Sequence, residues 1–169
     1  MSKTIYLIGF MGVGKSSIGK KLANKLQVPF LDTDDLLEKN FGMSIADYFA
    51  NNGEEAFRIA EKELLEQYDF QNAVVATGGG LPCFHQNMET MNANGTTIFL
   101  NRPSKELQQR LVNAKKQRPL IKDLNDSELL NFIEQKLNER LPFYEKAQII
   151  LDRNSQAVDD ILIKIADLK

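Results

Sequence analysis

The chain has 169 residues, a usual size for one domain and enough to bury a core without disulfides or a structural metal. Its 21 lysines and arginines nearly balance 23 aspartates and glutamates, so the formal charge of −2 provides no cationic field for nucleic acid. The single cysteine excludes an internal disulfide, no apolar run is long enough to cross a bilayer, and the N-terminus shows no signal-sequence pattern. We expect one domain over residues 1–169, a cytoplasmic monomer that binds neither nucleic acid nor membranes.

Short apolar stretches rich in β-branched residues alternate with segments of helical spacing along the chain. The predicted strands are 4–9, 28–31, 73–76, 96–100 and 149–151. The predicted helices are 15–25, 34–40, 44–51, 53–68, 86–92, 104–114, 126–146 and 157–168. Because parallel strands need helix-length crossovers, this alternation predicts an α/β fold, a doubly wound five-stranded parallel sheet flanked by helices.

A phosphate-binding loop lies directly between the first strand and the first helix. Residues 9–16, Gly-Phe-Met-Gly-Val-Gly-Lys-Ser, fit the pattern G-x-x-x-x-G-K-[ST]. The backbone amides of Gly12, Val13 and Gly14 are expected to cradle nucleotide phosphates at the helix N-terminus. Lys15 would bridge the β- and γ-phosphates, the Ser16 hydroxyl would coordinate Mg²⁺, and Ser17 would donate a further hydrogen bond. The motif predicts an ATP-binding P-loop, because a turn that only reverses the chain needs neither flanking element.

Three carboxylates follow the second strand, at the sheet edge where α/β proteins bind ligands. On extended chain Asp32 and Asp34 share a face. We expect Asp32 to lie near Mg²⁺ through water and Asp34 to accept the proton of an attacking hydroxyl. For Asp35, the role of helix N-cap is the preferred reading.

The third strand ends in Thr77 and three glycines, 78–80, whose backbone amides are expected to stay open to a ligand. Arg58 follows Phe57 on a helix that carries Glu61 one turn on, with Ile45 and Phe49 on the preceding helical segment. These residues predict an anion site with apolar walls.

Two further arginines are expected to reach the cleft. Arg140 precedes Pro142, which should break or kink the long helix and aim Arg140 inward. Residues of about 115–126 have few apolar positions and predict a mobile lid, in which Arg118 could close over the transferred phosphate.

Taken in order, these motifs resemble the shikimate kinase family: residues 9–16, Asp32-Thr-Asp34, Phe57-Arg58, Gly78-Gly-Gly80, Arg118-Pro-Leu120 and Arg140-x-x-x-Tyr144-Glu145. The resemblance runs nearly from end to end. It implies a nucleoside-monophosphate-kinase-like fold and the conversion of shikimate and ATP to shikimate 3-phosphate and ADP, in aromatic amino-acid biosynthesis.

The resemblance also implies residue roles, with acceptor-binding helices over about 34–62. Asp34 would bind the reacting hydroxyl, Arg58 and Arg140 the substrate carboxylate, and Gly79 and Gly80 would supply backbone contacts. Further implied roles are an apolar wall under the ring (Ile45, Phe49, Phe57), the lid arginine (Arg118) and positions around the adenine (Arg110, Arg153).

Other functions remain open from the residues alone. A gluconate or nucleotide kinase would share the P-loop, and paired arginines bind a phosphate as well as a carboxylate. A non-enzymatic nucleotide switch is less well supported, because the chain has no N-K-x-D motif. A switch also needs no second substrate site, whereas Asp34 with Arg58 looks like one. We expect His85 to be a surface side chain and Cys83 a small, partly buried one.

Overall fold

The computed structural model describes residues 4–114 and 121–168. Within these ranges, five parallel strands form one sheet in the order β2-β3-β1-β4-β5. The strands are β1 (Thr4–Ile8), β2 (Phe30–Asp32), β3 (Val74–Ala76), β4 (Gly95–Leu100) and β5 (Ile149–Leu151). The helices of the described residues are α1 (Lys15–Leu26), α2 (Thr33–Phe41), α3 (Ile45–Gln67), α4 (Asn87–Asn94), α5 (Ser104–Val112), α6 (Asp126–Tyr144) and α7 (Val158–Ala166), with short 3-10 turns η1 (Leu81–Cys83) and η2 (Arg153–Ser155).

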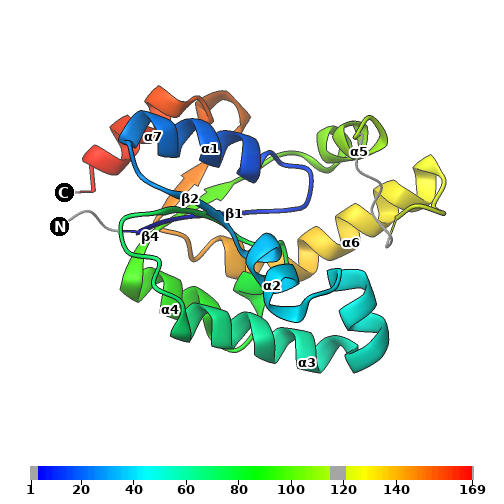
Figure 1. Ribbon diagram of the computed structural model, residues 1–169. Coiled ribbons are helices and arrows are strands. Elements are labelled where there is room, and N and C mark those ends of the chain that lie inside the picture. Colours follow the sequence, from blue (N-terminus) through cyan, green and yellow to red (C-terminus); the bar gives the residue numbers. More distant parts are fainter. Residues whose placement is uncertain (1–3, 115–120, 169) are drawn as a thin grey trace.

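Helices cover both faces of the sheet, α1 and α7 on one side and α3 and α4 on the other (Figure 1). The strands alternate between two cores: Leu7, Val74 and Ile98 pack with α1 and α7, whereas their neighbours on the chain pack with α3 and α4. These neighbours are Ile8, Val75 and Phe99. The predicted doubly wound parallel sheet is confirmed.

The second strand begins two residues later than predicted. Gln27 ends α1 in the left-handed conformation, with φ of 55°. The Val28 amide then donates to the Ala23 carbonyl at 3.0 Å, so it completes the cap of α1 instead of joining the sheet. The apolar stretch predicted as one strand over residues 28–31 is therefore divided between the cap of α1 and the start of β2.

Gly53 separates the two helical segments that the sequence predicts at 44–51 and 53–68. The structure joins them as α3, but Gly53 has φ of 82° and ψ of 173°, a conformation outside the helical region. Ser44 caps the start of α3 by accepting a hydrogen bond from the Asp47 amide at 3.1 Å. The expected break at Gly53 is therefore present as a kink.

The carboxyl ends of the strands face α2, α5 and α6, at the right of Figure 1. The P-loop follows β1 at this edge, Asp32 ends β2, and the glycines follow β3. Pro142 lies inside α6, which continues to Tyr144, so the helix does not break at this residue, and the alternative of a kink stays a prediction. Among residues 4–114 and 121–168, no helix combines the length and the apolar character that a membrane span requires.

Candidate active site

The P-loop wraps the N-terminus of α1. Gly14 occupies the N-cap position with φ of 110°, which a residue with a side chain rarely adopts. The Val13 side chain points away from this loop into the core and is only 1% exposed. The Val13 amide donates to the Phe10 carbonyl at 3.3 Å, so the loop curls on itself before α1 begins.

Lys15 reaches back across the loop. Its Nζ donates to the carbonyls of Gly9 at 2.8 Å and Phe10 at 3.0 Å. These contacts hold an ammonium group beside the positive end of α1, where phosphate oxygens would be attracted by both the charge and the helix dipole.

Asp32, not Asp35, caps α2. The Asp32 side chain accepts from the Asp34 amide at 3.1 Å, which leaves Asp35 exposed in the first turn and makes the predicted Asp35 cap wrong. Asp34 also lies in this first turn and not on extended chain as predicted. The other Asp32 oxygen accepts from the Ser16 hydroxyl at 2.8 Å, so the acid joins β2 to the P-loop helix.

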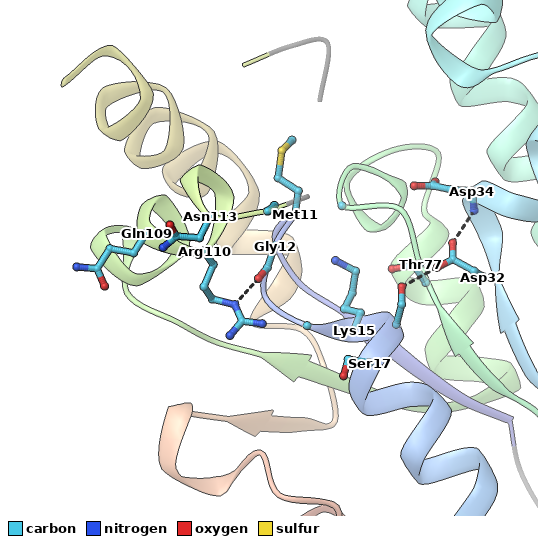
Figure 2. Close-up of a pocket in the computed structure, with 14 residues that line it drawn as sticks. Met11, Gly12, Lys15, Ser17, Asp32, Asp34, Thr77, Gln109, Arg110 and Asn113 are labelled. Atoms are coloured by element: carbon cyan, nitrogen blue, oxygen red, sulfur yellow. Dashed lines mark hydrogen bonds between the residues drawn. The ribbon is translucent and has the colours of Figure 1, made fainter. Parts of the chain in front are cut away.

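A cavity of about 650 Å³ brings most of these groups together. Figure 2 shows Asp32 and Asp34 on one side of the P-loop and Gln109, Arg110 and Asn113 on the other. Of the predicted residues, the cavity is lined by Gly12, Gly14, Lys15, Ser16, Ser17, Asp32, Asp34, Gly79 and Arg110. It is also lined by five residues that sequence reasoning missed: Met11, Thr77, Gln109, Asn113 and Ala114.

Some of the missed residues had a signal in the sequence. Thr77 directly follows β3 at the carboxyl edge, and its amide donates to Leu7 at 3.1 Å. Gln109 and Asn113 lie on either side of the predicted Arg110, near the end of α5. Their polar side chains are common on any helix surface, and only the position of α5 beside the P-loop distinguishes them.

Arg58 is buried between two carboxylates. Its Nη1 lies 2.8 Å from Glu61 and its Nη2 lies 3.1 Å from Glu54, although the Arg58 side chain is only 11% exposed. The guanidinium also lies over the ring of Phe84 at 4.2 Å and that of Phe57 at 5.3 Å. The predicted apolar walls are therefore present, with Phe49 at 6.0 Å.

Ile45 is half-buried and packs with the same core cluster as Phe49 and Phe57. Phe49 and Phe57 are themselves in contact, with ring centroids 4.7 Å apart. The start of α3 and the helix after its kink thus present one apolar surface around Arg58.

The three glycines each adjoin a charged side chain. A Cβ on Gly78 would lie 2.7 Å from Asp34, one on Gly79 would lie 3.1 Å from Arg140, and one on Gly80 would lie 2.6 Å from Arg58. The Gly78 amide donates to Thr33 at 2.9 Å, so the prediction that all three amides stay open is wrong for this residue. Missing side chains are what allow three charged groups to reach this turn.

Arg140 lies on the other side of the same turn. Its guanidinium is over the Phe10 ring at 5.5 Å, and the nearby Tyr144 hydroxyl donates to the Gly79 carbonyl at 2.5 Å. Burial raises the pKa of Tyr144, with Arg140 opposing the shift. Although α6 does not break at Pro142, Arg140 still faces the glycine turn.

Glu61 carries a perturbed carboxyl group near the site. Burial raises its pKa to about 7, against the lowering effect of Arg58, and Asp34 adds to the rise. Burial also raises the pKa of Cys83 to about 11, so this thiol is protonated, half-buried and inert. His85 is exposed, as predicted.

The remaining predicted arginines lie on α5, in η2 or outside the described residues. Arg110 Nε donates to the Gly12 carbonyl at 2.6 Å, which ties α5 to the P-loop. Arg153 pairs instead with Glu106. Arg118 and the first half of the predicted lid lie outside the described residues, whereas Ile121 and Leu124, in its second half, pack against the core.

The comparisons with known proteins agree with this geometry. The family model for shikimate kinase matches residues 11–168. A shikimate kinase from Bacteroides thetaiotaomicron is 45% identical over 157 residues, which cover 92% of this chain and 89% of that protein.

Two solved structures are similar over nearly the whole chain. A crystal structure of shikimate kinase from Bacteroides thetaiotaomicron has a TM-score of 0.87 and 40% identity, covering 98% of this chain and 97% of that one. A structure of shikimate kinase from Acinetobacter baumannii in complex with shikimate has a TM-score of 0.80 and 34% identity, covering 99% of this chain and 93% of that one. With its P-loop, acidic turn and glycine turn joined at one sheet edge, the chain belongs to the shikimate kinase family.

Proposed function

We propose that this chain transfers the γ-phosphoryl group of ATP to the 3-hydroxyl of shikimate, giving shikimate 3-phosphate and ADP for aromatic amino-acid biosynthesis. The observation that carries the proposal is that Asp34 and Lys15 line one cavity, while Arg58 and Arg140 lie beside the glycine turn at its edge. A base, a phosphate site and two cations for a carboxylate are what this reaction needs.

Each residue has a distinct part in the transfer. The amides of Gly12, Val13 and Gly14, with Ser17 beside them, hold the nucleotide phosphates, and Lys15 neutralises the charge that develops on the transferred group. Asp34 accepts the proton of the attacking hydroxyl. Arg118 would add a further positive charge from the lid.

The protein holds the acceptor by its carboxylate, at a distance from the hydroxyl that reacts. Arg58 and Arg140 bind the shikimate carboxylate, and Gly79 and Gly80 contact the substrate through their backbone. The ring packs on Ile45, Phe49 and Phe57, which form an apolar surface around Arg58. Arg110 and Arg153 flank the adenine.

The oxygen ligands suit Mg²⁺. The Ser16 hydroxyl and the Asp32 carboxylate lie 2.8 Å apart beside the P-loop, and both are the hard oxygen donors that this ion prefers. Ser16 would bind the ion directly and Asp32 through water. Bound there, Mg²⁺ would neutralise negative charge on the nucleotide phosphates.

The proposal is tested by measuring ADP formation from ATP with shikimate, with gluconate, with a nucleoside monophosphate and with no acceptor. We expect strong stimulation by shikimate alone, because a kinase protects the γ-phosphate from water until its acceptor closes the site. Stimulation by gluconate or a nucleoside monophosphate without stimulation by shikimate would overturn the substrate but leave the P-loop kinase chemistry intact.

A further inference from the structure

Glu106, in the first turn of α5, joins two arginines that come from different parts of the chain. Its Oε2 lies 3.2 Å from Nη1 of Arg102, which follows β4, and its Oε1 lies 2.5 Å from Nη1 of Arg153 in η2. The side chains of Arg102 and Glu106 are 16% and 21% exposed, whereas that of Arg153 is 64% exposed. The half-buried pair therefore fixes the carboxylate, which presents its second oxygen to the solvent-facing Arg153.

The same helix also holds the P-loop. Arg110 lies one turn beyond Glu106 and donates to the Gly12 carbonyl at 2.6 Å. One rigid helix thus contacts the phosphate-binding loop through Arg110 and the loop after β5 through Glu106.

Two further hydrogen bonds tie the loop after β5 to the end of β4. Asn101 donates to Asp152 at 3.0 Å, and Gln156 donates to the Asn101 carbonyl at 2.8 Å. The backbone of this loop is therefore held at both of its ends. Between these two ends, the ion pair with Glu106 sets the position of the Arg153 side chain.

The direction of the cavity relates these contacts to the nucleotide. Its lining runs from Lys15 and Ser16 at the P-loop to Gln109, Arg110 and Asn113 along α5. None of the η2 residues lines this cavity, but Arg110 does, and Glu106, which holds Arg153, lies one helical turn before Arg110 on α5. With phosphates at the P-loop, a nucleoside that extends toward Arg110 would therefore lie next to η2.

We infer that Glu106 is a positioning residue for the nucleotide: oriented by Arg102, it holds Arg153 and the η2 loop against the nucleoside end of ATP. This inference rests on the proposed use of ATP. It differs from the ordinary role of an acid in the first turn of a helix, which is to stabilise the helix through its dipole. If Glu106 acted only on the helix dipole, its loss would lower the stability of the fold and would not raise the KM for ATP relative to the KM for shikimate.

Glu106→Gln tests the inference, since it keeps the shape of the side chain and removes its charge. We expect the KM for ATP and the Kd for ADP to rise roughly two- to fivefold, the range for a pair with one exposed partner. The KM for shikimate and the kcat should stay within the error of the parent values. The ADP measurement, by titration calorimetry, needs no acceptor.

Arg153→Gln should give the same rise, and the double variant should be no worse than either single variant because both remove one interaction. Glu89→Gln is the matched control: it removes another carboxylate from a solvent-exposed ion pair, with Lys146 at 2.8 Å, and should change neither KM.

Three results would overturn the inference: an unchanged ADP Kd in Glu106→Gln, effects of Glu106→Gln and Arg153→Gln that add in the double variant, or an equal rise in both KM values with lowered stability. If the parent binds ADP but does not phosphorylate shikimate, the proposed acceptor is wrong. In that case the ADP affinities of the variants still decide the role of Glu106.

Discussion

At the scale of single residues, the position of Asp34 makes it the proton acceptor of the proposed transfer. It lines the cavity with Lys15, and the position of a Cβ on Gly78 would be 2.7 Å from its Oδ1. Asp34→Asn should keep this shape and lose the proton acceptor. We expect kcat to fall by about 10²–10⁴-fold, the usual contribution of a general base, with an unchanged Kd for ATP.

Asp35→Asn is the control for this prediction. Asp35 lies on the next position of α2, is exposed, and does not line the cavity. The kcat of the Asp35→Asn variant should equal that of the parent under saturating substrates. Comparable kcat values for Asp34→Asn and the parent would refute the assignment of the base.

Glu61 gives the site a dependence of stability on pH. Burial raises its pKa to about 7 in the folded protein, against a usual value of 4.5. Between these two values the folded state keeps a proton that the unfolded state has released, so the free energy of unfolding falls as pH rises. Glu61→Gln removes this loss, and we expect the free energy of unfolding of the variant relative to the parent to increase by about 2 kcal/mol from pH 5 to pH 7.

Urea unfolding at pH 5, 6, 7 and 8 measures this difference. The pH dependence is the quantity to compare, because the amide also weakens the contact with Arg58 at every pH. Glu66→Gln is the control on the same helix: Glu66 is 51% exposed and pairs loosely with Lys62 at 3.7 Å. Its curve should run parallel to that of the parent, and a parallel curve for Glu61→Gln would show that Glu61 is ionised throughout.

At the scale of elements, the turn between β3 and η1 is shaped by the charged groups packed against it. A Cβ on Gly80 would lie 2.6 Å from Nη1, 2.8 Å from Nη2 and 2.9 Å from Cζ of Arg58. Because these atoms end a flexible side chain, Gly80→Ala should displace the guanidinium rather than unfold the turn. We expect shikimate to bind about 10- to 100-fold more weakly, since a charged hydrogen bond contributes about 1.5–3 kcal/mol.

Separate titrations with shikimate and with ATP check this prediction, together with urea unfolding. The ATP affinity should be unchanged, and the stability should fall by less than about 1 kcal/mol. Arg58→Lys keeps the charge but loses the planar, two-pronged guanidinium. It should weaken the binding of shikimate to a similar extent and leave the binding of ATP unchanged. An unchanged shikimate affinity in Gly80→Ala would mean that Arg58 does not hold the acceptor.

At the scale of the whole molecule, nucleotide binding should stabilise the fold, because the P-loop connects β1 at the centre of the sheet to α1. At an ADP concentration of 100 times its Kd, the expected gain is about 2.7 kcal/mol. For a chain of this length that gain raises Tm by roughly 5–11 °C.

Thermal unfolding with and without ADP and Mg²⁺ measures the shift in Tm. Lys15→Met should lose most of it, since its ammonium no longer attracts the phosphates. Lys21→Met, on an exposed part of the same helix, should keep the full shift. Equal shifts in all three proteins would place the nucleotide away from the P-loop.

The sequence by itself determined the architecture and the centre of the site. Strand and helix periodicity are local properties, so the parallel sheet, the break at Gly53 and the start of α6 could all be predicted from neighbouring residues. The P-loop is equally local, because its glycines, Lys15 and Ser16 lie within one short segment. For the same reason Asp34 could be assigned to the sheet edge.

Tertiary structure decided which side chains become partners. Asp32 caps α2 because its carboxylate also meets Ser16, 16 residues earlier in the chain, and no spacing rule distinguishes it from Asp35. Glu106 meets Arg153 across 47 residues, and the burial of Glu61 depends on packing against the β3 turn. Such contacts follow from how elements approach in space, since a charged side chain on a helix surface has the same local pattern whether it faces solvent or an arginine.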